Sequence, residues 1–334
     1  MTHPPSETVS PAAAGDDALL RKAGEKLRAA EGGSVIERAA RRLRQSAEGP
    51  SGPAAAQAPA SGAATDRPAR GERFPPGRSV RQPLDFARLD REGMITPQAG
   101  YSPLAEQFRI IKRPLLLDAF KRPPPRQGNA NVLMVTSARP GEGKTFVACN
   151  LALSIAQEHD YSVLLLDADV RHPSVAAVLG IAAGRGLTDM LADPSVDPGD
   201  AMIRAANLPN LAVVPAGREG AGAPELFASQ RMARLLDEFA GRYPDRITII
   251  DTPPVLASSE PSVIALHAGQ TLMVVEADKT NVRAVQSALA LLRQCPSISL
   301  VLNRARDSLG AEEFGQYGYA YADRGDGAAA PKHD

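Results

Sequence analysis

The sequence predicts an α/β protein with a mostly parallel sheet that is flanked by helices on both faces. From residue 131 onward, short and almost uninterrupted runs of Val, Ile and Leu recur, as expected of strands buried on both faces. Helical patterns separate these runs, and such alternation places ligands at the carboxyl ends of the strands. The expected strands are NVLMVT (131–136), SVLLLD (162–167), LAVVP (211–215), ITIID (247–251), TLMVVE (271–276) and ISLVLN (298–303). The expected helices are 144–158, 224–240, 260–267 and 281–294.

Residues 1–82 are predicted to be largely disordered. The first aromatic residue is Phe74, and residues 48–80 form a linker dominated by Pro, Gly and Ala. Short helical patterns precede the linker at 16–30 and 34–44. The second pattern is rich in Arg, which suits either a solvated basic helix or a docking helix for a partner protein.

A helix is expected to open at Ser102 and Pro103, which are typical of an N-cap and a first helical turn. Its apolar face carries Leu104, Phe108, Ile111 and Leu115. Pro114 is predicted to kink or end this helix. On another face, Glu106, Arg109 and Lys112 recur at three-residue spacing, most simply as a charged side that faces solvent.

A glycine-rich phosphate loop connects the first expected strand to its helix. In TSARPGEGKT (136–145), the glycines let backbone N–H groups point inward, and the following helix adds its positive end. Ala138 replaces the first glycine of the full G-x-x-x-x-G-K-[ST] pattern, but the flanking strand and helix predict a P-loop NTPase that binds ATP and Mg²⁺. The expected nucleotide contacts are Pro140, Gly141, Glu142, Gly143, Lys144, Thr145 and Phe146, and the Thr145 hydroxyl is expected on the metal.

Acidic residues follow two of the expected strands. Asp167 and Asp169 come at the end of LLLDADVR, and Asp251 ends ITIID. Carboxylates this close repel each other unless a cation lies between them, and Mg²⁺ on a nucleotide is the natural cation. Arg171 follows as a further nucleotide contact. Asn303 ends the last strand, where binding of the adenine edge and turn capping are equally good explanations.

The C-terminal segment, 313–334, contains three alternate tyrosines in GQYGYAYAD: Tyr317, Tyr319 and Tyr321. The interspersed glycines and the lack of apolar partners predict a flexible tail rather than a strand. Repeated phenols next to an ATP site suggest phosphate acceptors; a packing tail is the alternative.

These motifs resemble the bacterial tyrosine kinases (BY-kinases) of exopolysaccharide synthesis, closest to the exosortase-associated (XrtA-type) autokinases. The resemblance covers about residues 82–322, with a kinase domain at 83–312. It rests on ARPGEGKT, LLLDADVR, IIDTPP, APELFASQRMARLL and the tyrosine cluster, and ERAARRLRQ, LDREGMITP and LAEQFRIIKRPLL point to the subgroup.

The resemblance implies a role for each motif. Lys144 and Thr145 bind phosphates and metal, Asp169 and Asp251 serve the metal, and Asp167 is the leading candidate for the base, although the sequence does not separate it from Asp169. The family's Glu-x-x-Arg-x-x-Arg oligomerisation motif matches Glu106 and Arg109, with Lys112 in place of the third residue. Lysine does not reproduce a bidentate guanidinium contact.

The implied function is an ATP-dependent tyrosine autokinase that phosphorylates its own tail, in trans, to regulate exopolysaccharide synthesis and export. The resemblance implies that the chain forms a ring-like homo-oligomer and has a separate membrane co-polymerase and a cognate tyrosine phosphatase as partners. It also implies that the chain is cytoplasmic and is held at the inner membrane through a partner. With 38 Lys and Arg against 38 Asp and Glu, the charge balance favours no nucleic-acid partner. The apolar runs are too short for a membrane span, which needs about 20 residues.

Two rival interpretations come from other classes. A MinD/ParA-type positioning ATPase shares the phosphate loop, but it carries a signature lysine where this chain has Arg139, and it lacks a tyrosine tail. A catalytically silent nucleotide-binding scaffold is the second rival, against which the intact Lys144 and the three acidic residues argue.

Overall fold

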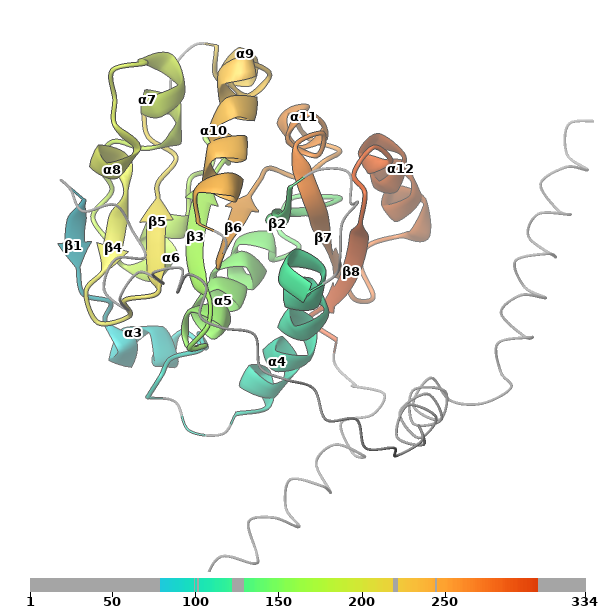
Figure 1. The fold of residues 1–334 in the computed structure, drawn as a ribbon. Coiled ribbons are helices and arrows are strands. Elements are labelled where there is room, and N and C mark those ends of the chain that lie inside the picture. Colours follow the sequence, from blue (N-terminus) through green and yellow to red (C-terminus); the bar gives the residue numbers. More distant parts are fainter. Residues whose placement is uncertain are drawn as a thin grey trace, which may run out of the picture. The chain divides into compact units, whose positions relative to one another are not determined.

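The computed structural model describes residues 79–98, 100, 102–121, 129–218, 222–243 and 245–305. Among them is an eight-stranded sheet in the order β1-β4-β5-β3-β6-β2-β7-β8 (Figure 1). The strands are β1 (Val80–Gln82), β2 (Asn129–Ser137), β3 (Ser162–Asp167), β4 (Ile203–Ala205), β5 (Leu211–Val214), β6 (Arg246–Asp251), β7 (Ala268–Glu276) and β8 (Ile298–Asn303). Neighbouring strands are parallel except β4 and β5, which are antiparallel.

Helices cover both faces of the sheet. They are α3 (Phe86–Arg91), α4 (Pro103–Leu116), a π-helical turn η2 (Leu117–Lys121), α5 (Lys144–Ala156), α6 (Val175–Leu179), α7 (Leu187–Ala192), α8 (Pro198–Ala201), α9 (Ala223–Phe227), α10 (Gln230–Arg242), α11 (Glu260–Ile264) and α12 (Val282–Leu292). One buried apolar cluster joins the sheet to α7 and α9–α12, and a second joins it to α3–α6. Period-two alternation explains this division, since Val132 and Met134 of β2 lie in the first cluster and Leu133 and Val135 in the second.

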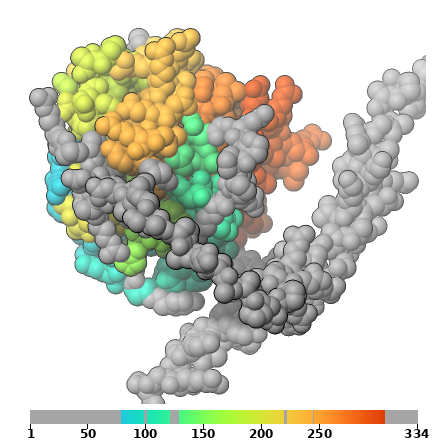
Figure 2. Space-filling model, in the orientation of Figure 1, coloured from blue at the N-terminus to red at the C-terminus, as the bar shows by residue number. Residues whose placement is uncertain are grey.

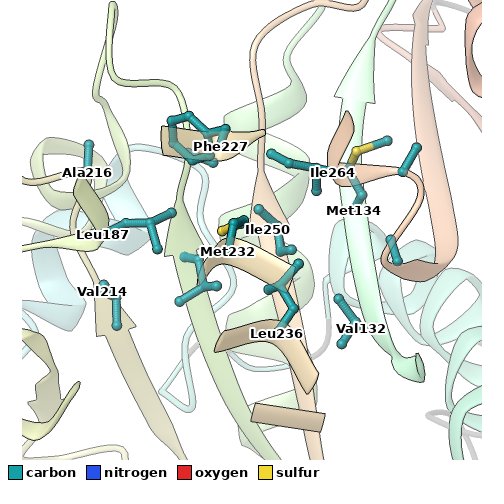
Figure 3. Packing of buried hydrophobic residues seen from close by; sticks show 14 of the residues in the cluster. Val132, Met134, Leu187, Val214, Ala216, Phe227, Met232, Leu236, Ile250 and Ile264 are labelled. Carbon is teal, nitrogen blue, oxygen red and sulfur yellow. The ribbon is translucent and has the colours of Figure 1, made fainter. Parts of the chain in front are cut away.

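Helix α10 shows how the first cluster is built. Met232 and Leu236 share one face of the helix and pack with Ile250 of β6 (Figure 3). In the space-filling view the surfaces of α10, α11 and α12 follow one another across this side of the molecule (Figure 2). None of the described helices is long and apolar enough to cross a bilayer.

All six strands expected from the sequence are present, and the predicted fold class is confirmed. The sequence analysis missed β1 and β4, which have three residues each and no apolar run. β1 lies just before the predicted start of the kinase domain and pairs with β4 at the edge of the sheet. The predicted helices at 16–30 and 34–44, the predicted linker up to residue 78 and the tail at 313–334 lie outside the described residues. Residues 80–82, at the end of the predicted disordered region, instead form β1.

The expectation of one helix at 224–240 is wrong, because the chain forms α9 and α10 with a break at Ser229. The Ser229 hydroxyl donates to the carbonyl of Leu226 (2.6 Å) at the end of α9. The same oxygen accepts the N–H of Met232 (3.3 Å) and so caps α10. The serine therefore ends one helix and starts the next.

Helix α4 begins as predicted, with the Ser102 hydroxyl accepting the N–H of Ala105 (3.1 Å). It does not end at Pro114 but continues to Leu116, and the π-helical turn follows. Lys112 is a second departure, because its side chain is buried rather than directed to solvent. Its ammonium donates to the carbonyl of Ser154 (2.9 Å) and pairs with Glu158 (2.6 Å), so it fastens α4 to α5.

Candidate active site

The phosphate loop lies between β2 and α5. Gly141 and Gly143 have φ values of +85° and +93°, in the region that favours glycine. A side chain at Gly143 would also collide with the amide of Asn303, whose Nδ2 lies 2.2 Å from the position of a Cβ. Ala138, which replaces the first glycine of the motif, is buried in the apolar core, so the fold accommodates its methyl group. The structure therefore contains the predicted loop in spite of the departure from the motif.

Sheet order brings the acidic strand ends to this loop. β6 lies between β2 and β3, and Asp167 is paired in register with Asp251. The Thr145 hydroxyl donates to Asp251 Oδ2 (2.6 Å). Lys144 Nζ lies 2.9 Å from Asp169 Oδ2 and 3.6 Å from Asp251 Oδ2. The three acidic residues and the lysine predicted from separate motifs thus meet at one edge of the sheet.

Asp167 and Asp169 have different environments. Asp167 accepts three backbone N–H groups, from Asp169 (3.1 Å), Ser174 (3.0 Å) and Val175 (3.0 Å). It thereby holds the loop that leads into α6. The Asp169 carboxylate pairs with Lys144 and accepts the N–H of His172 (3.2 Å). Asp169 is therefore the acid already paired with Lys144.

Burial of so many charges changes their proton affinities. Burial raises the pKa of Asp251 to about 7 even though Lys144 and the Thr145 hydroxyl oppose it. Burial also raises the pKa of Asp167 to about 6, against its three backbone N–H donors. For Lys144, burial lowers the pKa, but the carboxylates of Asp251, Asp169 and Asp167 outweigh burial, so its pKa is raised. One ammonium is thus surrounded by more acidic groups than it can neutralise.

The donor set at this edge fits a magnesium ion bound together with nucleotide phosphates. Among the described residues, Asp251 Oδ1 is buried without a hydrogen-bond partner, and it lies on the carboxylate that holds the Thr145 hydroxyl. That oxygen is a ligand atom which a cation can complete. No group of three or more His, Cys, Asp or Glu side chains in the described part of the chain could hold a metal alone. Mg²⁺ commonly binds through one or two carboxylates plus substrate phosphates, as this arrangement allows.

Because Asp251 is buried, Asp251→Asn is expected to stabilise the nucleotide-free protein at pH 8, by on the order of 1–2 kcal/mol. Its folded pKa of about 7 lies above the ordinary 3.8, so the folded state binds more protons between these values. Stability therefore falls as pH rises through this window. Asparagine keeps an acceptor for Thr145 and carries no charge.

Thermal unfolding at pH 5 and pH 8 tests this expectation, with Asp160→Asn as the exposed control. The gain for Asp251→Asn should be present at pH 8 and largely lost at pH 5. Equal changes at the two pH values, or a loss at pH 8, would contradict it.

The other predicted nucleotide contacts occupy different positions. Pro140 is exposed at the start of the loop. Phe146 lies in the first turn of α5 and packs against the second buried apolar cluster. Arg171 lies exposed in the loop after β3. Asn303 donates from Nδ2 to the carbonyl of Glu142 (2.9 Å), so its amide contacts the phosphate loop. Binding of adenine by Asn303 stays a prediction.

Two residues at the site carry no signal in the motifs. Ser174 lies in the loop held by Asp167, and its hydroxyl is 3.2 Å from the Thr145 hydroxyl oxygen. Thr280, in the loop after β7, donates a short hydrogen bond to the carboxylate of Glu142. Both contacts depend on loop conformations that no local pattern encodes.

The predicted oligomerisation residues do not act alike. Glu106 and Arg109 form an ion pair on the exposed side of α4 (2.6 Å). Lys112, by contrast, is committed to Ser154 and Glu158 of its own chain. The predicted acceptors Tyr317, Tyr319 and Tyr321 lie outside the described residues.

Comparisons with known proteins agree with the fold. The ParA family, described as NUBPL iron-transfer P-loop NTPase, matches residues 128–303, more than half of the chain. Tyrosine-protein kinase YwqD of Bacillus subtilis (strain 168) is 31% identical over 216 residues, which are 64% of this chain and 86% of that kinase. The crystal structure of the chimerical protein CapA2B2 matches with a TM-score of 0.56 and 26% identity, over 69% of this chain and 93% of that one.

A longer relative matches this chain over only part of its own length. Tyrosine-protein kinase wzc of Salmonella typhimurium (strain LT2) is 34% identical over 198 residues, which are 58% of this chain. These residues cover 27% of the length of wzc. The similarity therefore concerns only about a quarter of the length of that relative.

Proposed function

The chain belongs to the ParA-type P-loop NTPases and, among them, to the bacterial tyrosine-protein kinases; from this premise we propose that it transfers the γ-phosphoryl group of ATP to tyrosines of its own C-terminal segment. The observation that carries the proposal is the meeting of Lys144 with Asp167, Asp169 and Asp251 beside the glycine loop. This arrangement supplies the cation and the acids that phosphoryl transfer to a phenol needs.

Lys144 and the phosphate loop are proposed to bind the triphosphate. The backbone N–H groups near Gly141 and Gly143 and the start of α5 favour an anion. Thr145, Asp169 and Asp251 would hold Mg²⁺, which neutralises charge on the transferring group. Lys144, which pairs with Asp169 and Asp251 in the nucleotide-free protein, would contact the phosphates once nucleotide and metal are bound.

A carboxylate must take the phenolic proton, because a tyrosine with a pKa near 10 is neutral at physiological pH. We propose Asp167 for this role. Its raised pKa makes it a better proton acceptor than an ordinary aspartate. Asp169, held by Lys144 at 2.9 Å, suits the metal instead.

Tyr317, Tyr319 and Tyr321 are the proposed acceptors, presented in trans by a neighbouring subunit of a ring-like oligomer. The finer biological setting follows from the family: regulation of exopolysaccharide synthesis and export, with a separate membrane co-polymerase and a tyrosine phosphatase as partners. The exposed Glu106–Arg109 pair supports an interface on α4. The assignment to the exosortase-associated subgroup is part of this proposal.

Incubation of the full chain with Mg-ATP, followed by detection of phosphotyrosine, tests the proposal. Wild type should become phosphorylated, and replacement of Tyr317, Tyr319 and Tyr321 by Phe should remove most of the signal, by about tenfold or more, because phenylalanine has no hydroxyl to accept the group. The triple variant should still bind ATP as wild type does. Unchanged phosphorylation of the triple variant would place the acceptors elsewhere.

A ParA-like positioning ATPase is the alternative function, since the family match alone allows it. Such a protein would hydrolyse ATP without phosphotyrosine. Wild type that binds and hydrolyses ATP yet forms no phosphotyrosine, even with its membrane partner present, would reject the kinase proposal in favour of this alternative.

A further inference from the structure

The carboxylate of Glu142 links the phosphate loop to the loop after β7. Glu142 is 3% exposed although it stands in the middle of the phosphate loop. The N–H of Arg139 donates to its Oε2 (2.9 Å), and the hydroxyl of Thr280 donates to its Oε1. The side chain thus points away from the phosphate-binding side and into the end of the sheet formed by β7 and β8.

The orientation of the Thr280 hydroxyl is fixed by a second bond. The N–H of Glu276 donates to Thr280 Oγ1 (3.2 Å), so the hydroxyl accepts there and its own hydrogen is available for Glu142. The N–H of Thr280 in turn donates to the carbonyl of Glu276 (3.1 Å). The Glu276 carboxylate binds Lys279 (2.7 Å) and Arg304 (2.8 Å). Thr280 is therefore held in a rigid loop.

The end of β8 supports the same residue from its backbone. Asn303 donates to the carbonyl of Glu142 (2.9 Å), and the carbonyl of Asn303 accepts the N–H of Ala277 (2.9 Å). Its amide also packs against Gly143. Side chain and main chain of Glu142 are thus both anchored to the ends of β7 and β8.

A carboxylate in a loop that binds phosphates is unfavourable unless it is turned away and hydrogen-bonded. The two partners of this carboxylate, a backbone amide and a hydroxyl, are neutral and partly buried, so they act through geometry rather than through charge. Because Gly141 and Gly143 leave the loop backbone permissive, the anchor at Glu142 restricts which conformations the loop adopts.

We propose that Glu142 and Thr280 are positioning residues which hold the phosphate loop in its nucleotide-binding conformation and make ATP affinity depend on the loop at residues 277–281. The proposal rests on nucleotide binding at this loop, which is part of the proposed function. Neither residue touches the reacting atoms, so the effect belongs to binding rather than to the chemical step.

The test measures the Kd of Mg-ATP for the full chain, with thermal unfolding of the nucleotide-free protein beside it. Thr280→Val keeps the shape but removes the hydroxyl, and it should raise the Kd about tenfold, because a buried carboxylate loses its donor. Thr280→Ser, which keeps the hydroxyl, should bind within about twofold of wild type. At saturating ATP, the phosphorylation rate of Thr280→Val should stay within about twofold, a split that a general loss of structure would not give.

Thr271→Val is the matched control, because the Thr271 hydroxyl contacts Cys295 (3.2 Å) elsewhere on β7. It should leave the Kd unchanged. Glu142→Ala removes the contact from the other side and should raise the Kd similarly, and adding Thr280→Val to it should change little further. If Thr280→Val does not fold, the Kd of Mg-ATP for Glu142→Ala tests the proposal instead.

Wild type that fails to bind ATP would overturn the proposed function and this inference together. Wild type that binds, with Thr280→Val and Glu142→Ala binding equally well, would overturn the inference alone. Fully additive losses in the double variant would also overturn it, because the two residues would then act separately.

Discussion

Lys144→Met is expected to reduce the rate of tyrosine phosphorylation by about 10²–10³-fold or more. Lys144 is the cation that the structure places at 2.9 Å from Asp169 and beside the phosphate loop. Methionine has similar length but no charge, so the developing negative charge on the transferred group loses a preorganised partner. Single-turnover phosphorylation at saturating Mg-ATP measures the loss.

The same substitution should destabilise the folded protein, and more at pH 8 than at pH 5. Burial holds the pKa of Asp251 at about 7 and that of Asp167 at about 6 while Lys144 is present. Without the ammonium both values rise further, so the folded state loses stability at pH 8, where these groups are ionised in the folded wild type. At pH 5 the folded groups are largely protonated and the loss of Lys144 matters less.

Lys112→Met is the matched control, since Lys112 is another buried lysine with a carboxylate partner, at the C-terminal end of α5, whereas the site lies at its N-terminal end. It should lower thermal stability and leave the Kd of Mg-ATP unchanged. Lys144→Met that phosphorylates at the wild-type rate, or a Lys112→Met protein that loses ATP binding to the same degree, would contradict the role given to Lys144.

The fold and most of the site follow from local sequence. Each of the six long strands is a largely apolar run, and burial on both faces leaves few other structures for such a run. The expected burial is wrong for β8, because it lies at the edge of the sheet and exposes Leu300 and Leu302. Asp167 and Asp251 stand at the ends of two of these runs, and parallel strands bring their carboxyl ends to one edge. Their meeting with Lys144 was therefore predictable without knowing any contact.

Other features depend on tertiary contacts that have no sequence period. β1 and β4 are three-residue strands, and they exist because they pair with each other and β4 pairs with β5 at the sheet edge. The break at Ser229 arises because one hydroxyl makes hydrogen bonds to backbone groups of two helices. The helical pattern of 224–240 gives no sign of these bonds. Lys112 looked like a surface residue because its partners, the carbonyl of Ser154 and the carboxylate of Glu158, lie more than 40 residues further along the chain, at the end of α5 and just after it.

The sequence also left the choice of base open, and a pair of variants resolves it. Asp167→Asn is expected to lower kcat by about 10²–10⁴-fold, the usual contribution of a general base, while the Kd of Mg-ATP stays within about threefold. Asp169→Asn should instead raise the Kd and the Mg²⁺ requirement, because it removes the partner of Lys144 and a proposed metal ligand. Equilibrium binding and single-turnover rates measured on the same preparations separate the two effects.

The Kd of Mg-ATP also shows whether Asp167→Asn disturbs the loop that the Asp167 carboxylate holds. Its carboxylate accepts the N–H groups of Ser174 and Val175, so a collapsed loop would displace Ser174 from Thr145 and weaken Mg-ATP binding too. A fall in kcat with an unchanged Kd is therefore the signature of a lost base. If Asp169→Asn gives that signature instead, Asp169 is the base.

Proton affinity favours Asp167 for a physical reason. A phenol with a pKa near 10 gives its proton to a carboxylate with a pKa of about 6 more easily than to one at the ordinary 3.8, by on the order of 3 kcal/mol. The ammonium of Lys144 makes its shortest carboxylate contact with Asp169, at 2.9 Å, so Asp169 is already paired with a cation. Asp169, a proposed metal ligand, is thus the aspartate next to Lys144, and Asp167, buried and without a cation at that distance, is the one that we propose as the acceptor for the tyrosine proton.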